Sequence, residues 1–207
     1  MTLEAWALFC LTETLLCLNP GPSVLLVLSL ALTRGQLAGL LATLGVLTAN
    51  LGYFTLSASG LVALHALSAE AFLAIKWAGA AYLIWIGMRM LLRSFRTPDA
   101  GAPAELAPPA SRSFWQGLTT QGANPNLLVY FTAILPQFVD PAHPMPGQVA
   151  ILASSSIVIE LAVLSCYAAL AARAGRRAAP RFRRVAERIG GGLLIAAGAG
   201  LAALRRT

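Results

Sequence analysis

Two asparagine–proline pairs break long apolar stretches of the sequence and are the first candidates for chemistry. Proline lacks an N–H group and its ring clashes with the preceding helical turn, so each pair predicts an interrupted helix. An interruption inside a membrane presents helix ends that can hold a carboxylate and a cation, as an amino-acid zwitterion requires. A simple packing kink is the alternative for either break alone. We predict substrate binding by the residues of both breaks, Asn19, Pro20, Gly21, Pro22, Asn124, Pro125 and Asn126.

Two glutamates lie within the same apolar stretches. Glu160 is in the middle of SSSIVIELAVLSCYAAL, where an ionised carboxylate costs at least about 2.5 kcal/mol on membrane-insertion scales. It is predicted to couple transport to protons or to pair with a substrate ammonium group, and a structural pairing with a buried polar side chain is the alternative. Glu13 precedes Asn19 by six residues, which is not a same-face helical spacing. Glu13 is a second proton-coupling candidate that either lines the same cavity or lies nearer the membrane surface.

Asn50 is a polar position in another apolar stretch, close to Thr48. A hydrogen bond between helices is the favoured interpretation, and substrate binding by Asn50 is the alternative. His65 and His143 have no histidine, cysteine or carboxylate cluster around them at ligand spacing, so no metal site is predicted. The sequence has no nucleotide-binding motif, and we expect no cofactor and no enzymatic activity. Any energy source is then an ion gradient.

The composition indicates an integral membrane protein. Hydrophobic residues make up 57% of the 207 residues and charged residues 11%, whereas soluble domains carry about 25% charged residues. Apolar runs of about 20 residues recur, each long enough to cross a bilayer as a helix. Lipid requires backbone groups to be satisfied internally, and the runs do not alternate as barrel strands do. We predict an all-α polytopic fold with six transmembrane helices at roughly residues 3–28, 39–61, 72–92, 114–138, 149–172 and 189–204.

Proline- and alanine-rich residues 96–112 divide the chain into two halves of three spans each. Residues 1–92 are the first predicted repeat, 93–112 a cytoplasmic linker, and 113–207 the second repeat, all within a single membrane domain. Three spans per half invert the second repeat relative to the first, as in many secondary transporters. Twelve arginines fall on one side of this arrangement, seven of them within a predicted loop at residues 173–188. The positive-inside rule makes that side cytoplasmic and places both termini outside.

The predicted partners are a small-molecule substrate and the lipid bilayer. The net charge of +7 is attributed to membrane orientation and to anionic lipid headgroups, and not to nucleic acid. Gly192, Ala196 and Gly200 form a stripe of small residues at a spacing of four. Such a stripe permits close helix packing, either within the bundle or in a homodimer.

Two other function classes stay open at this point. A membrane thiol-redox protein would need two of the three cysteines within disulfide reach. Cys10 and Cys17 are about 10 Å apart along a helix that rises 1.5 Å per residue, so only Cys166 meeting one of them would support that function. A scaffold or channel without uphill transport is the other alternative.

Four motifs together resemble the LysE/RhtB family of bacterial amino-acid exporters. They are NPGP at 19–22, KWAGAAYLIWIG at 76–87, Gly-x-Asn-Pro at 122–125 and Pro-Gln-Phe at 136–138. The resemblance covers nearly the whole chain and implies six helices, export of small amino acids or their derivatives across the bacterial inner membrane, and coupling to the proton motive force. Two positions depart from the family pattern: Asn126 stands where a lysine is usual, and Ser23 where an asparagine is common. The cargo therefore does not follow from the resemblance.

Overall fold

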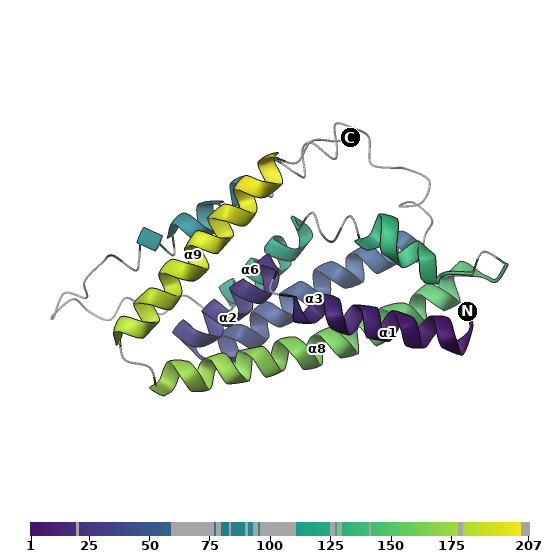
Figure 1. Cartoon of the computed structure of the whole chain (residues 1–207), viewed down its shortest axis with the longest axis horizontal. Coiled ribbons are helices and arrows are strands. Elements are labelled where there is room, and N and C mark those ends of the chain that lie inside the picture. The colour runs from purple at the N-terminus through teal and green to yellow at the C-terminus, as the bar shows by residue number, and fades with distance from the viewer. Residues whose placement is uncertain are drawn as a thin grey trace.

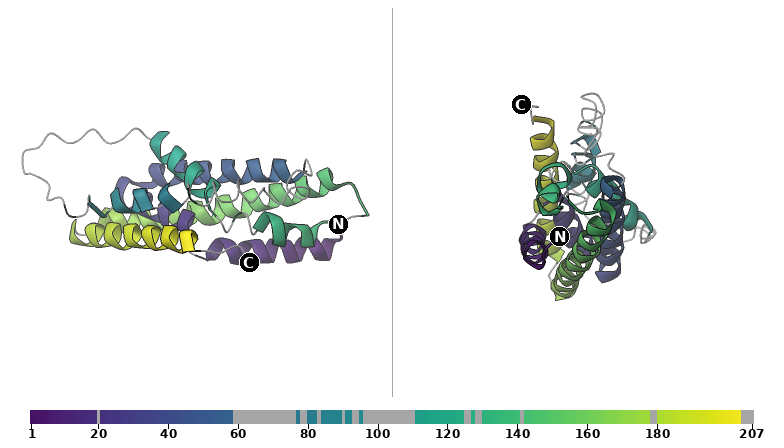
Figure 2. Two further views of the ribbon diagram at one scale, coloured as in Figure 1. Left: turned by 90° about the horizontal axis from the view of Figure 1, so that it is seen from above. Right: turned by 90° about the vertical axis from the view of Figure 1, so that its right-hand side faces the viewer.

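The computed structural model of the chain describes residues 1–19, 21–58, 111–124, 127, 130–140, 142–177 and 180–203, with scattered residues between 77 and 95. All regular structure in these residues is helical, and the helices lie mostly along the long axis of the molecule (Figures 1 and 2). The elements are α1 (Leu3–Leu18), α2 (Pro22–Arg34), α3 (Gln36–Ala58), α6 (Ser111–Gly122), η1 (Tyr130–Ile134), η2 (Leu135–Phe138), α8 (Met145–Arg177) and α9 (Pro180–Ala203).

The first predicted span is two helices and not one. α1 ends at Leu18, and Asn19 has an extended backbone with φ −75° and ψ 123°. α2 then begins at Pro22, where a missing N–H costs nothing because the first helical turn has no intrahelical acceptor for it. The two helix axes meet at 55°. The NPGP motif thus ends one helix and starts the next, and Pro20 lies outside the described residues.

The fourth predicted span is also interrupted. α6 ends at Gly122, and the chain continues past Asn124 into the π-helix η1 and the 3₁₀-helix η2. Pro125 and Asn126 lie outside the described residues, as does most of the third predicted span at 72–92. The interruption lies at the asparagine–proline pair at which the sequence predicts it.

The predicted arginine-rich loop at 173–188 is mostly helical. α8 extends through Arg177, and α9 begins at Pro180, so only residues 178 and 179 separate them, and these lie outside the described residues. Arginine and alanine are strong helix formers, which lets both helices continue beyond their apolar portions. The sequence predicts a loop at 173–188 because the apolar run ends where the arginines begin.

Two apolar clusters occupy opposite ends of the bundle. The phenylalanine-rich cluster joins α1, α3, η1, η2 and α8 and includes Phe9, Phe54, Phe131, Phe138 and Leu152. The alanine-rich cluster joins α2, α3, α8 and α9 and includes Leu26, Val27, Ala31, Ala42 and Ala168. Polar residues lie between the two clusters. On α3 and α8 these polar residues follow the apolar ones at intervals of four residues, which places them on the same face of the helix.

The antiparallel pair α3 and α8 shows this order most clearly. Along α3, Ala42 and Val46 precede Asn50, which precedes Phe54. α8 runs the other way, from Leu152 through Ser156 and Glu160 to Leu164 and Ala168. Each helix therefore carries one stripe that is apolar, then polar, then apolar again, and the two polar segments meet.

Glycines let α3, α6, α8 and α2 approach closely. A Cβ atom at Gly45 would collide with the backbone carbonyl of Phe114, and one at Gly117 with that of Ala42. Gly175 of α8 lies in the same way against the carbonyl of Leu32. Small residues of this kind replace a hydrophobic driving force between helices in lipid. The predicted stripe on α9 does not do this, since Gly192 and Ala196 are exposed and Gly191 makes the close contact with Gly87 instead.

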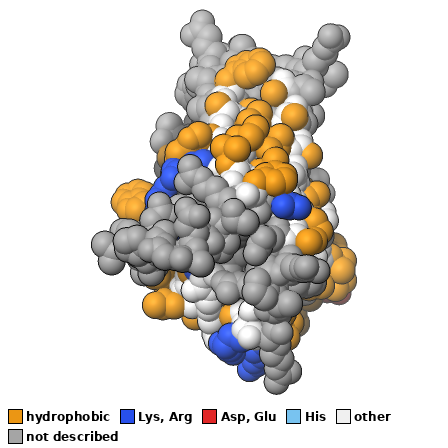
Figure 3. Space-filling view, turned by 90° about the vertical axis from the view of Figure 1, so that its left-hand side faces the viewer, with side chains coloured by type: hydrophobic (Ala, Val, Ile, Leu, Met, Phe, Trp, Pro, Cys, Tyr) orange, Lys and Arg blue, Asp and Glu red, His pale blue; other side chains and the backbone are white. Residues whose placement is uncertain are grey.

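Length and composition allow α3 and α8 to cross a membrane, and α1 with α2 to form a third, bent span, among the described residues. Arg34 at the end of α2 and Arg173 and Arg176 near the end of α8 define the arginine-bearing end of the molecule. Among the described side chains visible in Figure 3, most are hydrophobic and a few are basic. The all-helical fold is confirmed for the described residues. The six-helix inverted repeat stays a prediction, as do the domain boundaries, because the third span and the linker fall largely outside those residues.

Candidate functional site

A cavity of about 410 Å³ lies between the two apolar clusters. It is bounded by the ends of both broken segments and by the polar portions of α3 and α8. Six residues singled out from the sequence line it together: Glu13, Asn19, Gly21, Asn50, Asn124 and Glu160. Pro22 does not line the cavity, although its neighbours on both sides do. The structure thus brings the two breaks and both intramembrane glutamates to one place.

The first break presents opposite helix ends to this cavity. Leu16 and Cys17 belong to the last turn of α1, whose carbonyl groups give that end partial negative charge. Gly21 caps α2 without a side-chain hydrogen bond, and Ser23 and Val24 of its first turn also line the cavity. Amide groups of a first turn have no acceptor within their own helix and carry partial positive charge. This helix start can accept a carboxylate.

Both glutamates are buried and hydrogen-bonded. Asn50 donates from Nδ2 to Oε2 of Glu160, and the Ser156 hydroxyl donates to Oε1 of Glu13 at 2.5 Å. Ser156 lies one turn before Glu160 on α8, so this helix serves both carboxyl groups. The described lining residues include no lysine, arginine or histidine. The site is therefore rich in acceptors and lacks a basic partner within the described lining, which favours cations or protons.

A chain of amides continues from Asn50 to the two breaks. Gln121 donates from Nε2 to Oδ1 of Asn50 at 2.8 Å. Its Oε1 accepts from the Ser23 hydroxyl at 2.5 Å and from Nδ2 of Asn124 at 3.3 Å. Asn50 therefore forms the interhelical hydrogen bonds that the sequence favoured, and it also lines the cavity. Thr48 takes no part, because its hydroxyl donates to the Leu44 carbonyl on its own helix.

Four polar lining residues were missed in the sequence: Ser23, Gln121, Tyr130 and Ser156. Helical spacing could have found two of them, since Gln121 precedes Asn124 by three residues and Ser156 precedes Glu160 by four. The Tyr130 hydroxyl is buried beside the carboxyl group of Glu13 and makes no well-aligned hydrogen bond among the described residues. Such a hydroxyl keeps hydrogen-bonding capacity for a water or a ligand atom.

The thiol-redox arrangement is not present in the structure. Cys10, Cys17 and Cys166 are all free, and Cys166 is exposed on α8. Cys17 lines the cavity, with its Sγ 4.0 Å from Oε1 of Glu13. Within the described part of the chain, no three histidine, cysteine or acidic residues gather as metal ligands would.

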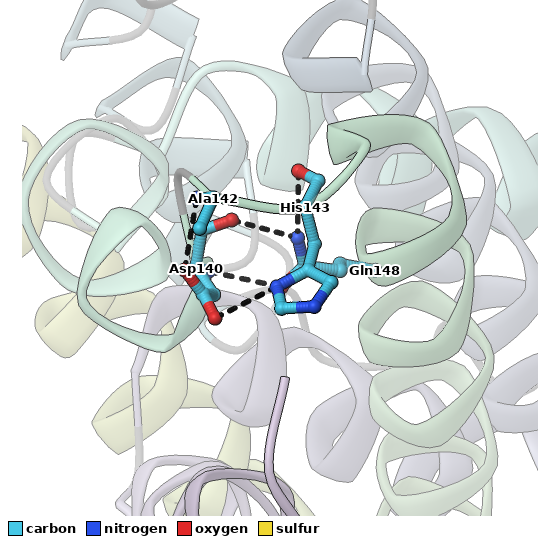
Figure 4. A network of polar contacts seen from close by, with 4 residues as sticks. All are labelled: Asp140, Ala142, His143 and Gln148. Carbon is cyan, nitrogen blue, oxygen red and sulfur yellow. Dashed lines mark hydrogen bonds and ion pairs between the residues drawn. The ribbon is translucent and has the colours of Figure 1, made fainter.

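His143 belongs to a small polar network outside the cavity, in the turn that leads into α8 (Figure 4). Its Nδ1 lies 2.9 Å from Oδ2 of Asp140, whose Oδ1 accepts from the backbone N–H of Ala142. Gln148 of α8 pairs with the backbone of Asp140 through both amide atoms. These bonds, the Ala142 N–H first and His143 second, hold the pKa of Asp140 below its ordinary range. The network fastens the turn to α8.

The chain is similar to known proteins over most of its length. Residues 14–205 match the family model of the LysE type translocators. The chain is 34% identical over 209 residues to a homoserine/homoserine lactone efflux protein of Salmonella typhimurium, covering 99% of each chain. It is 31% identical to an uncharacterized membrane protein of Vibrio cholerae, covering 85% of each, and 30% identical to a leucine efflux protein of Klebsiella pneumoniae, covering 72% of this chain and 69% of that one. No solved structure matches the chain.

Proposed function

The chain belongs to the family of LysE type translocators, and from this premise we propose that it exports small amino acids or their derivatives from the cytoplasm in exchange for protons. It is a membrane transporter and not an enzyme. Its relatives include proteins named for efflux of homoserine, of homoserine lactone and of leucine. Substrates of that size fit a cavity of about 410 Å³.

The proposal depends on one observation: the start of a helix and two carboxyl groups line the same cavity. The substrate carboxylate binds at the first turn of α2, near Ser23 and Val24. The substrate ammonium group binds on the acceptor side, at Glu160 with Glu13 as the second carboxyl group. Asn19 and Asn124 add neutral hydrogen-bonding groups at the two breaks.

Proton coupling follows from competition at Glu160. An ionised Glu160 attracts the ammonium group, and a protonated Glu160 does not, so a proton and the substrate compete for one group. Binding of substrate from the cytoplasm displaces the proton there, and a proton from outside displaces the substrate. Glu13 contributes a second titratable group to the same cavity.

The arginine-bearing end of the molecule is proposed to face the cytoplasm. Arg34 ends α2, and Arg173 and Arg176 are exposed near the end of α8, beside the contact between Gly175 and Leu32. The positive-inside rule assigns this end to the cytoplasm of a bacterial inner membrane and both termini to the outside. Rocking of the two halves about the cavity would expose the site to each side in turn.

Purified protein in liposomes tests the proposal. Vesicles loaded with radiolabelled homoserine or leucine are given an opposing substrate gradient and an imposed proton gradient, and uphill efflux is recorded. Glu160→Gln is expected to abolish uphill efflux and to leave the protein folded in the membrane, because it removes the group for which substrate and proton compete. Glu4→Gln, at an exposed position in the first turn of α1, is the matched control. Full uphill efflux by the Glu160 variant would refute the assigned role, and efflux of no amino acid by the wild type would refute the function.

A further inference from the structure

Gln121 is the junction of the polar network. It joins Asn50, and through it Glu160, to one residue at each break: Ser23 in the first turn of α2 and Asn124 after α6. All five side chains are buried, with between 5% and 8% of their surface exposed. Burial makes each donor and acceptor count, because bulk water does not replace a missing partner there.

The hydrogen-bond directions in this network are set by the charge on Glu160. An ionised carboxylate only accepts, so Asn50 must point its NH₂ group at Glu160 and its oxygen at Gln121. Gln121 must then point its NH₂ group at Asn50, which leaves its oxygen to accept from Ser23 and Asn124. The structure shows this arrangement in full.

A protonated Glu160 can reverse the same chain. Its O–H group donates to the oxygen of Asn50, whose NH₂ group then points at the oxygen of Gln121. Gln121 in turn presents its NH₂ group to Ser23 and Asn124, both of which can accept. No proton passes along the amides, and only their orientations change. The proton that binds Glu160 comes from one side of the membrane and leaves to the other.

We propose that Gln121 is a positioning residue that reports the protonation of Glu160 to both helix breaks by presenting either its carbonyl oxygen or its NH₂ group to them. This inference rests on the proposed function, since it concerns how the exporter links its proton to its substrate. A single glutamine thereby sets the hydrogen bonding of Ser23, where the substrate carboxylate binds, and of Asn124 at the second break.

Three other titratable groups line the cavity that Glu160 faces. Glu13 and Cys17 belong to α1, and Tyr130 belongs to η1. Glu13 is held by Ser156 and not by the amides. Among the described residues, none of the three hydrogen-bonds to Asn50 or Gln121, so the amide chain responds to Glu160 through its own direct bond.

The experiment compares uphill efflux with substrate exchange for Gln121→Met, which keeps the length of the side chain and removes both polar atoms. Efflux driven by a proton gradient is expected to fall about tenfold or more relative to exchange, because the variant loses coupling in addition to the contacts of Gln121 within the cavity. Gln116→Met is the matched control, because Gln116 lies on the same helix and does not line the cavity.

A second variant separates positioning from packing. Gln121→Glu places a carboxyl group that, once protonated, offers the same donor and acceptor as glutamine, and that only accepts when ionised. Uphill efflux by this variant is expected to recover at acid pH and to be lost at neutral pH, whereas Gln121→Met stays uncoupled at both. In an Asn50→Leu background, Gln121→Met is expected to have little further effect, because both changes cut the same chain.

The outcomes distinguish the two proposals. Wild-type protein that performs no uphill efflux overturns the proposed function and this inference with it. Coupled efflux by wild type that Gln121→Met retains overturns the inference alone, as does equal loss of exchange and uphill efflux in that variant. Recovery of Gln121→Glu at acid pH supports the inference, and its absence with intact wild-type activity overturns it.

Discussion

Replacing Ser156 with alanine tests whether Glu13 carries a charge during transport. Glu13 is buried, with 6% of its surface exposed, and Ser156 is 1% exposed. The serine hydroxyl donates to Oε1 of Glu13 at 2.5 Å. Ser154 and Ser155 precede it on α8 and donate to the carbonyl of Ile151 on their own helix. Only the third serine of this run serves the cavity.

The size of the effect depends on the charge of the acceptor. A hydrogen bond to an ionised group contributes about 1.5–3 kcal/mol, and 1.4 kcal/mol is tenfold in an equilibrium constant, so Ser156→Ala should then slow uphill efflux by about 10- to 150-fold. A neutral hydrogen bond between membrane helices averages about 0.6 kcal/mol, which corresponds to about threefold. We expect the larger loss if Glu13 is ionised in the cycle, and the smaller loss if Glu160 alone titrates.

The assay is uphill efflux from liposomes at matched protein content, with Ser154→Ala as the control. Ser154→Ala should stay within about twofold of wild type, because its hydroxyl bonds only to its own helix. Ser156→Ala should have little further effect in a Glu13→Gln background, since the two residues act through one bond. An effect of Ser156→Ala that persists undiminished in that background would refute the assignment to Glu13.

Three further predictions concern packing, the turn before α8 and Tyr130. Gly45→Leu should abolish the monodisperse peak in detergent chromatography, because its side chain would collide with the Phe114 carbonyl; Gly52→Ala, with open space around it, should not, and a normal peak for Gly45→Leu would contradict the packing. Asp140→Asn should lower the melting temperature at pH 7. Because the pKa of Asp140 is lowered in the fold, its stabilisation is complete above its unfolded value and disappears as the pH falls through the folded value, so wild type and variant should converge below about pH 4; a constant difference down to pH 2 would exclude this linkage. Tyr130→Phe should raise the substrate KM by up to about tenfold with little change in melting temperature, because the hydroxyl lines the cavity and makes no well-aligned hydrogen bond within the described protein; an unchanged KM would remove Tyr130 from substrate binding.

The sequence predicts a cavity residue correctly where a single polar residue lies among apolar ones. Burying Asn50, Asn124 or Glu160 in lipid without a polar partner costs free energy. This cost identifies the three residues as candidates whatever the fold is. Gln121 and Ser156 escaped because each lies among other polar residues, where the contrast is weak. Their helical spacing from Asn124 and Glu160 was the signal available. Whether these residues bind substrate or protons stays a prediction.

The position of Glu13 shows why spacing alone failed at the first break. The six-residue interval to Asn19 was measured as if one helix continued through both. α1 ends at Leu18, and Asn19 is extended, so its side-chain direction does not follow the helical period. Glu13 and Asn19 therefore line the same cavity. The predicted end of α8 and the predicted start of α9 were wrong for a different reason. Arginine and alanine continue both helices beyond their apolar portions.

The two apolar clusters differ in what it would take to part them. Phe54 stands edge-on to Phe131 at 4.8 Å and Phe9 edge-on to Phe138 at 5.3 Å, and each such ring buries about 150–250 Å². The other cluster is built largely of alanines with short side chains, and its helices approach one another closely at Gly39 and Gly175. We therefore expect that separating the helices of the phenylalanine-rich cluster costs more free energy than separating those of the alanine-rich cluster. If the arginine-bearing end faces the cytoplasm, as proposed, we expect the substrate-free protein to open its cavity more readily toward the cytoplasm. An exporter needs this opening in order to bind its substrate.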